Sequence, residues 1–278
     1  MTSSTNPPPA APDALIEAAL HDLAVAAPKG LSDRTLIAVG LADAYAPIDT
    51  AIGQIWVAFN GLGVSSVESA VSAAEFETRA LATRGRRAHG VGVLPPRLAS
   101  GIQRRLAGDR RVNIPLDLRG HTAFETDVWM KALEIPRGEV RPYGWIAAEI
   151  GRPNAVRAVG TALGHNPVPL IVPCHRVVRS DGMLGQYSLG GAANKRTLLA
   201  SEGLDPEGME GLARSGIRYI GSDTTRVYCL PTCHNAQRIA EKHRVAFRSA
   251  GDGARAGYRA CRECRPAAAA CPTAGATA

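Results

Sequence analysis

The alternation of apolar and polar positions changes period along the chain, and the changes separate strands from helices. Residues 52–67 contain two runs rich in β-branched and aromatic residues on either side of Asn60-Gly61. That dipeptide favours a type I′ turn, so a β-hairpin is predicted here. Helical spacing follows at residues 72–81 and 98–106. This part of the chain is therefore expected to form a small sheet with flanking helices.

A second group of helical patterns starts near residue 122. In residues 124–134 the apolar positions Val128, Trp129 and Ala132 lie on one helical face. Two shorter helices are predicted at 143–150 and 155–163, separated by the breaker residues 151–154, with Asn154 as the cap of the second. This is the pattern of a helix-turn-helix, although an ordinary helical hairpin in a protein core also fits it and is far commoner than a DNA-binding pair.

The pattern as a whole predicts an α+β chain with a small N-terminal sheet domain, a helical domain that contains the helix-turn-helix, and a small C-terminal domain. The expected boundaries are a partly disordered leader at 1–45 with a helix at 13–26, the sheet domain at 46–121, the helical domain at 122–210, the C-terminal domain at 221–266 and a disordered tail at 267–278.

The composition limits the classes of protein to which this chain can belong. The 278 residues are 45% hydrophobic, which is ordinary for a globular protein. No stretch approaches the roughly 18–20 apolar residues that cross a bilayer, and the first residues lack the basic flank and apolar run of a signal peptide. We therefore expect a cytoplasmic protein with no membrane partner.

Charge and cysteine placement both draw attention to the second half of the chain. The net charge is +7, and residues 221–266 hold nine Lys or Arg against four Asp or Glu. A polyanion such as nucleic acid is compatible with this surplus, although charge alone does not identify it. All six cysteines lie at or after Cys174. In a reducing compartment they favour thiolate chemistry or metal binding over disulfides.

Cys174 follows the apolar run 170–172 and precedes His175 and Arg176. Such a cysteine on its own is usually a small core residue. A thiol reacts as the thiolate, however, and a neighbouring imidazole or cation lowers its pKa from about 8.5. Adjacent side chains on an extended strand point apart, so His175 is expected to act through a bridging water, oriented by a carboxylate. Asp181 and Glu202 are the downstream candidates.

Four other cysteines form two close pairs, Cys229-x3-Cys233 and Cys261-x2-Cys264, with 27 residues between the pairs. These spacings suit a tetrahedral four-thiolate zinc site. A segment this short with few large apolar residues needs such a staple to fold. The C-terminal domain is therefore predicted to bind zinc.

Residues 124–203 closely resemble the O6-alkylguanine-DNA alkyltransferases. The resemblance lies in residues 135–140, in Arg157-Ala158-Val159-Gly160, in Asn166-Pro167-Val168-Pro169, in 171–178 including Pro173-Cys174-His175-Arg176, and in Gly185-Gln186-Tyr187-Ser188. A weaker match upstream, at 52–60 and 115–120, resembles the small sheet domain of the same family. The resemblance implies repair of double-stranded DNA by a monomer that moves an alkyl group from O6 of guanine to Cys174, once and without a cofactor.

The resemblance also implies roles for individual residues. The catalytic set would be Cys174 as acceptor, His175 as the base acting through water, Glu202 as its orienting carboxylate, Asn166 as the holder of the turn that presents the active-site strand, and Tyr143 as the hydrogen-bond partner of the base. The target base must leave the helical stack to be reached. The DNA-binding set would be Arg157, which fills the vacated stack from the minor groove, and Ser188, in the loop that closes over the base.

Residues 224–266 resemble the zinc-binding domain of the Ada adaptive-response protein, with Cys229, Cys233, Cys261 and Cys264 as the zinc ligands. The resemblance implies that Cys229 is a second methyl acceptor, for methylphosphotriesters, and that Arg259 contacts DNA. Leu230 and Glu263 stand where that family usually has basic residues. A purely structural or DNA-anchoring zinc module therefore stays open beside phosphotriester repair. For the whole chain, the alternative to repair is a zinc-dependent DNA-binding sensor of alkylation.

Overall fold

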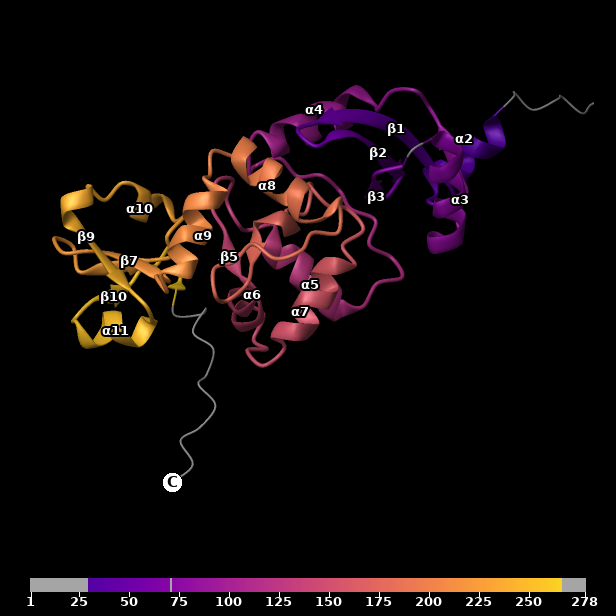
Figure 1. Cartoon of the computed structure of the whole chain (residues 1–278). Coiled ribbons are helices and arrows are strands. Elements are labelled where there is room, and N and C mark those ends of the chain that lie inside the picture. Colours follow the sequence, from indigo (N-terminus) through magenta and orange to yellow (C-terminus); the bar gives the residue numbers. More distant parts are fainter. Residues whose placement is uncertain (1–29, 71, 267–278) are drawn as a thin grey trace, which may run out of the picture.

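The computed structural model describes residues 30–70 and 72–266, and these form three units in a row. A sheet with flanking helices lies at one end, a mainly helical unit in the middle and a second small sheet at the other end (Figure 1). The α+β class and the three-part order predicted from the sequence are confirmed. The expected helix at 13–26 and the tail at 267–278 lie outside the described residues.

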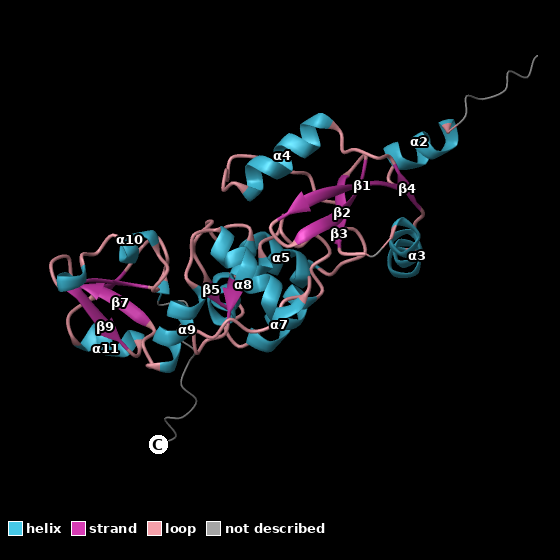
Figure 2. Ribbon diagram, turned by 45° about the horizontal axis from the view of Figure 1, so that its top comes forward, coloured by secondary structure: helices cyan, strands magenta, loops and turns pink. Residues whose placement is uncertain are grey.

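The first unit is a four-stranded sheet with the strand order β3-β2-β1-β4. Its elements are α2 (Leu31–Ala38), β1 (Asp43–Thr50), β2 (Gly53–Asn60), β3 (Gly63–Glu68), α3 (Ala73–Arg84), β4 (Ala88–Gly90) and α4 (Pro96–Leu106). Strand β1 pairs antiparallel with β2 and parallel with β4. Figure 2 shows α3 and α4 on opposite sides of the sheet region. The unit begins with α2 and β1, before the boundary at residue 46 that the sequence pattern suggested.

The predicted hairpin between β2 and β3 is present, but the predicted type I′ turn at Asn60-Gly61 is wrong. Asn60 is the last residue of β2 and pairs with Gly63, and it is not among the described non-glycine residues with a positive φ. Its buried side-chain amide donates to Asp43 Oδ1 at 2.7 Å and to Asp117 Oδ2 at 2.8 Å. These two bonds hold Asn60 in the strand, because a buried amide donor that loses its acceptors is costly.

The middle unit contains the predicted helix pair. Its elements are α5 (Ala123–Ala132), β5 (Arg141–Pro142), α6 (Tyr143–Glu149), α7 (Val156–Gly164), the 3-10 turn η1 (Cys174–Arg176), β6 (Val177–Val178), α8 (Gly191–Ser201) and α9 (Pro206–Arg214). The predicted cap Asn154 is wrong by one residue: α7 begins after Ala155, and no side chain caps it. Trp129 is fully buried and donates its indole N–H to Ala162 O at 2.8 Å, which ties α5 to α7.

One continuous core joins the first two units. It contains Val57 and Val64 from the sheet and Val128 and Trp129 from α5. At the edge of the sheet, the backbone N–H of Val67 donates to Pro167 O at 2.8 Å. The sheet therefore supports the loop that precedes η1.

The third unit is a four-stranded sheet with the order β10-β8-β7-β9. Its elements are β7 (Tyr219–Ser222), β8 (Val227–Cys229), α10 (His234–Gln237), η2 (Glu241–His243), β9 (Arg244–Phe247), α11 (Ala250–Arg255) and β10 (Arg259–Ala260). Its core consists largely of four aromatic rings and the four paired cysteines. Within the described residues, no helix combines the length and apolar character needed to cross a membrane.

Candidate active site and metal centre

Cys174 lies at the start of η1 and not on the extended strand that the sequence pattern predicted. The backbone N–H of Cys174 donates to Val172 O at 2.8 Å, and that of Arg176 donates to Pro173 O at 2.9 Å. These local bonds coil the chain into one 3-10 turn directly before β6. The whole of residues 170–178 is buried. Cys174 is therefore held in a hydrogen-bonded turn inside the core.

Asn166 holds that turn from the side. Its Nδ2 donates to Val172 O and to Cys174 Sγ, both at 3.1 Å, while its Oδ1 accepts from the N–H of Val168 at 3.1 Å. Within the same loop Leu170 has φ 73, a left-handed conformation that is unfavourable for a branched side chain. The asparagine amide thus fixes the loop and also gives the cysteine sulfur a donor.

Two opposing influences act on the Cys174 thiol. Burial raises its pKa and is the largest influence, because the low-dielectric interior disfavours the thiolate. Hydrogen bonds from Asn166 and Ser188 and the charge of Lys195 lower the pKa, but burial outweighs them. Cys174 is therefore a thiol at neutral pH and needs a base when it reacts.

His175, within this turn, faces Glu202 at the end of α8. His175 Nε2 is 2.9 Å from Glu202 Oε1, and the Arg176 guanidinium donates to both oxygens of Glu202 at 2.7–3.0 Å. Burial raises the pKa of Glu202, but hydrogen bonds from His175 and Arg176 outweigh it and hold that pKa at about 2. The stabilisation from this charged carboxylate is present above pH ~4.5 and is lost as the pH falls towards 2.

The imidazole of His175 is neutral at pH 7. Burial lowers its pKa below the ordinary 6.5. Since Nε2 faces the ionised Glu202, the proton resides on Nε2, and the lone pair resides on Nδ1. Nδ1 is buried with no hydrogen-bond partner among the described residues. A buried polar nitrogen of this kind is normally satisfied by a water, which fits the bridging water expected from the sequence. The other candidate carboxylate, Asp181, pairs with Arg179 at 2.7 Å.

Lys195 is a residue of this site that sequence reasoning missed. It lies on α8, is fully buried, and donates its ammonium to Val177 O at 2.6 Å and to Gln186 O at 3.4 Å. Burial lowers its pKa to about 8, and the nearby Cys174 opposes that change. A lysine in a polar helix is normally solvated, so no sequence signal marked it.

The three remaining predicted residues of this site lie at different depths. Tyr143 is half-buried at the start of α6, and burial followed by the charge of Cys174 raises the pKa of its phenol. Ser188 is exposed in the loop before α8, although its hydroxyl reaches Cys174. Arg157 is exposed on α7 and forms no side-chain hydrogen bond or ion pair with any described residue.

The four paired cysteines converge in the third unit. Their sulfur atoms all lie within 4.8 Å of one another, and all four side chains are buried. The N–H of Leu230 donates to Cys264 Sγ at 3.4 Å, and Asn235 Nδ2 donates to Cys261 Sγ at 3.6 Å, as is typical of thiolate ligands. Contact with Cys233 and Cys264 raises the pKa of Cys229, so four thiolates need a cation among them. The donor set fits a divalent metal that prefers tetrahedral sulfur.

An open cavity of about 520 Å³ lies beside this cluster. Cys229 and Cys261 line it, whereas Cys233 and Cys264 do not. The rest of its lining is rich in cations and hydroxyl groups: Ser222, Thr224, Thr225, Arg238, His243, Arg259 and Arg262. Arg259 is exposed on β10. The cavity therefore brings several cations and hydroxyl groups, together with the acidic Glu263, beside two of the four cysteines.

Two family models match the chain. One is 6-O-methylguanine DNA methyltransferase, DNA binding domain, at residues 123–204, and the other is the metal binding domain of Ada, at residues 213–267. The first contains Cys174 and the residues around it, and the second contains all four paired cysteines. Together with the buried cluster, the second match confirms the predicted zinc site of the C-terminal unit.

Curated relatives match part of the chain. The methylated-DNA--protein-cysteine methyltransferase of Mycobacterium tuberculosis (strain H37Rv) is 54% identical over 90 residues, which are 32% of this chain and 53% of that protein. The protein of the same name from Rattus norvegicus is 44% identical over 115 residues, covering 39% and 54%. The chain thus spans about half the length of these relatives. The crystal structure of Mycobacterium tuberculosis OGT in complex with DNA matches with 37% identity and a TM-score of 0.47, covering 57% of this chain and 92% of that one.

Proposed function

We propose that this protein repairs DNA by moving a methyl group from O6 of guanine to Cys174. The chain matches the 6-O-methylguanine DNA methyltransferase, DNA binding domain, followed by the metal binding domain of Ada. The observation that carries the proposal is the set of contacts around the sulfur. A buried thiol sits in a turn fixed by Asn166, next to a neutral histidine whose other nitrogen faces an ionised carboxylate. The chemistry that this set supports is nucleophilic displacement by sulfur.

Each of these side chains has one step in the proposed reaction. His175 Nδ1 takes the thiol proton through one water, and Glu202 stabilises the resulting imidazolium. The Cys174 sulfur bonds to the methyl carbon as the bond from that carbon to O6 breaks. The guanine leaves with a proton in place of the methyl group, and Tyr143 hydrogen-bonds the base as charge develops on it. The thioether has no hydrolytic exit, so each chain reacts once.

The test uses two duplexes and the intact mass of the full chain, followed by peptide mapping. With O6-methylguanine in the duplex, we expect one methyl group per chain on Cys174. If the mass is unchanged after long incubation, the chain is a sensor of alkylation and not a repair protein. A duplex with a backbone methylphosphotriester is the second substrate.

Phosphotriester repair at Cys229 is the second candidate function, and the cavity beside the zinc cluster favours it. Cys229 lines that cavity together with arginines that suit a phosphate oxygen. Zinc keeps the ligand a thiolate and therefore a nucleophile. The methylphosphotriester duplex is expected to add a methyl group to the Cys229 peptide. An unmodified Cys229 would leave the zinc module a structural or DNA-anchoring unit.

Glu202→Gln is expected to slow methyl transfer to Cys174 by about 10²- to 10³-fold, measured as a single-turnover rate. The neutral amide no longer stabilises the imidazolium. Because the pKa of Glu202 is about 2 and that of His175 is lowered, the wild-type rate should fall only as the pH drops below the ordinary histidine pKa of about 6.5. Glu210→Gln is the matched control, since Glu210 pairs with Arg196 outside the active-site contacts. A rate within twofold of wild type at neutral pH would remove Glu202 from the mechanism.

We further propose that the chain binds as a monomer from the minor groove and rotates the target nucleotide out of the stack, with Arg157 in the vacated space. The exposed guanidinium of Arg157, on the second helix of the helix-turn-helix, has no side-chain partner among residues 30–70 and 72–266, and this supports the role. Arg157→Ala is expected to lower the transfer rate from duplex by about tenfold or more, because base extrusion costs a few kcal/mol. The rate with free O6-methylguanine nucleoside should not change. Arg152→Ala is the control, and an equal loss on both substrates would contradict the assignment.

A further inference from the structure

Residues 139–145, called here the bridging segment, lie between the zinc module and the active-site turn. The segment contains β5 and the first residues of α6. One side of it contacts the loops that carry the zinc ligands, and the other side pairs with β6, directly after η1. Although about 90 residues or more of sequence separate it from the zinc ligands, it is their immediate neighbour in space.

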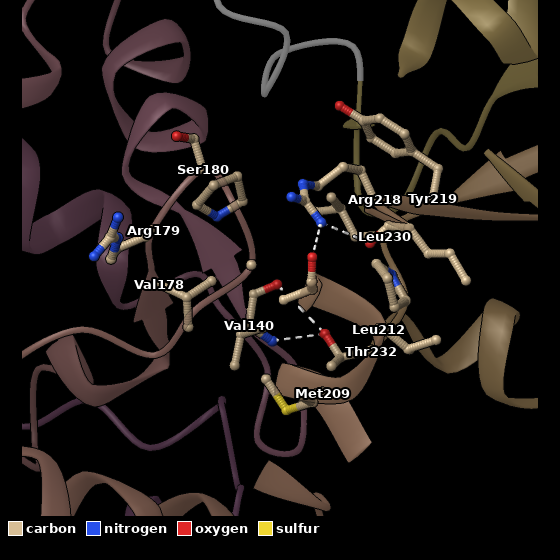
Figure 3. Close-up of a pocket in the computed structure, with 15 residues that line it drawn as sticks. Val140, Val178, Arg179, Ser180, Met209, Leu212, Arg218, Tyr219, Leu230 and Thr232 are labelled. Carbon is tan, nitrogen blue, oxygen red and sulfur yellow. Dashed lines mark hydrogen bonds between the residues drawn. The ribbon is translucent and has the colours of Figure 1, made fainter. Parts of the chain in front are cut away.

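Three residues of the zinc module, Thr232, His234 and Cys264, form hydrogen bonds with the bridging segment. The N–H of Val140 donates to Thr232 Oγ1 at 2.9 Å, as the close-up of this junction shows (Figure 3). The N–H of His234 donates to Glu139 Oε1 at 3.2 Å. Thr232 and His234 are the two neighbours of the ligand Cys233, so both bonds depend on the conformation of the chain around that ligand.

The third of these residues, Cys264, is itself one of the four clustered cysteines. The indole N–H of Trp145 donates to the backbone oxygen of Cys264 at 3.0 Å, and both groups are buried. The guanidinium groups of Arg141 and Arg265 both lie over the ring, at 5.6 and 5.3 Å from its centroid. Arg265 also pairs with Glu149 on α6 at 2.9 Å. The first helix of the helix-turn-helix is thereby fixed to the loop of the second cysteine pair.

The opposite side of the bridging segment reaches the active site. Arg141 pairs with Val177 and Pro142 with Val178 in a parallel two-stranded sheet, and Val177 follows η1 directly. Val177 O is also the acceptor of the buried Lys195 ammonium. Tyr143, the next residue of the segment, starts α6. The segment therefore links the ligands of the zinc site to the two elements that position Cys174 and Tyr143.

We propose that the zinc site has a second role, as the structural support of the alkyl-transfer site, which it exerts through the bridging segment. With zinc bound, the loops at Cys233 and Cys264 hold Val140 and Trp145 and keep β5 paired with β6. Without zinc, these loops lose their fixed conformation, and the bridging segment loses three of its hydrogen-bond partners. The active-site turn and Tyr143 then become more mobile, although zinc touches neither of them.

Hydrogen exchange on the full chain, with and without a zinc chelator, tests this role without reference to any activity. Peptides that cover α6 and residues 174–178 are expected to exchange about tenfold faster after zinc removal, the effect of losing a buried hydrogen bond. Trp145→Phe, which keeps an aromatic ring next to the two arginines but loses the indole N–H, should give most of this increase with zinc present. Thr232→Val, which removes only the hydroxyl acceptor of Val140, is the milder second variant. Trp56→Phe is the matched control, since its indole bonds Ala70 O in the first unit.

Two results distinguish a failure of this inference from a failure of the proposed function. Only the measurement of the methyl-transfer rate rests on the proposed function. If exchange in α6 and residues 174–178 is unchanged while residues 219–266 lose protection, the two units are independent and the inference is overturned. If exchange rises as expected but no methyl transfer occurs in the zinc-bound protein, the support role stands and the proposed function fails. Where transfer is observed, Trp145→Phe should slow it at Cys174 by about three- to tenfold and leave the zinc content unchanged.

Discussion

Cys174→Ala is expected to take up no methyl group from a duplex that contains O6-methylguanine, whereas the wild-type chain takes up one. The change removes the sulfur that accepts the methyl carbon in the proposed reaction. It leaves the turn itself supported, because Asn166 still donates to Val172 O at 3.1 Å and the backbone bonds of η1 do not involve the sulfur. The loss is therefore chemical and not a consequence of unfolding.

The measurement is the intact mass after reaction, with the thermal unfolding midpoint of each variant as a check on folding. Cys271→Ala is the matched control, since Cys271 belongs neither to the Pro173-Cys174-His175-Arg176 motif nor to the two cysteine pairs, and it should leave uptake at one methyl group per chain. Methylation of Cys174→Ala at the wild-type rate would place the acceptor elsewhere. A wild-type chain that stays unmodified would contradict the repair function altogether.

Much of this site was predictable because its motif is local. Asn166 and Cys174 are eight residues apart, and their contact depends on one loop. The participation of Glu202 was also expected. The hydrogen bonds from the Arg176 guanidinium to both oxygens of Glu202 were not. Its sequence position next to His175 suggested only a general cation. Its role depends on how α8 ends opposite η1, which is a tertiary arrangement that residue types do not encode.

Buried polar residues account for the main differences between expectation and structure. Asn60-Gly61 has the composition of a type I′ turn, yet Asn60 is held in β2 by Asp43 and Asp117, which are 17 and 57 residues away. Lys195 resembles a solvated helix residue, yet two carbonyl oxygens hold it beside the nucleophile. In both cases a distant partner overrides the local preference. The contact of Trp145 with Cys264, across 119 residues, is beyond sequence reasoning for the same reason.

Cys233→Ser is expected to abolish stoichiometric zinc binding and to unfold residues 219–266. All four cysteines are buried in a core that otherwise depends on a few aromatic rings, so the unit has little apolar area to stabilise it without metal. Zinc binding to small tetrathiolate modules contributes about 10–16 kcal/mol near pH 7, which is more than such a core supplies. A serine hydroxyl stays protonated at that pH and is a poor zinc ligand.

Zinc content per chain and hydrogen exchange in residues 219–266 measure this outcome together. The variant should hold far less than one equivalent of zinc, and its C-terminal sheet should exchange almost as fast as an unfolded chain. Cys271→Ser, with the same chemical change at a cysteine that belongs to neither sequence pair, should keep one equivalent and wild-type protection. A Cys233→Ser variant that retains one zinc and a protected sheet would mean that three sulfurs suffice. Because Thr232 and His234 flank Cys233, the same variant should also make the bridging segment more mobile. Loss of zinc binding would then also disturb the alkyl-transfer site.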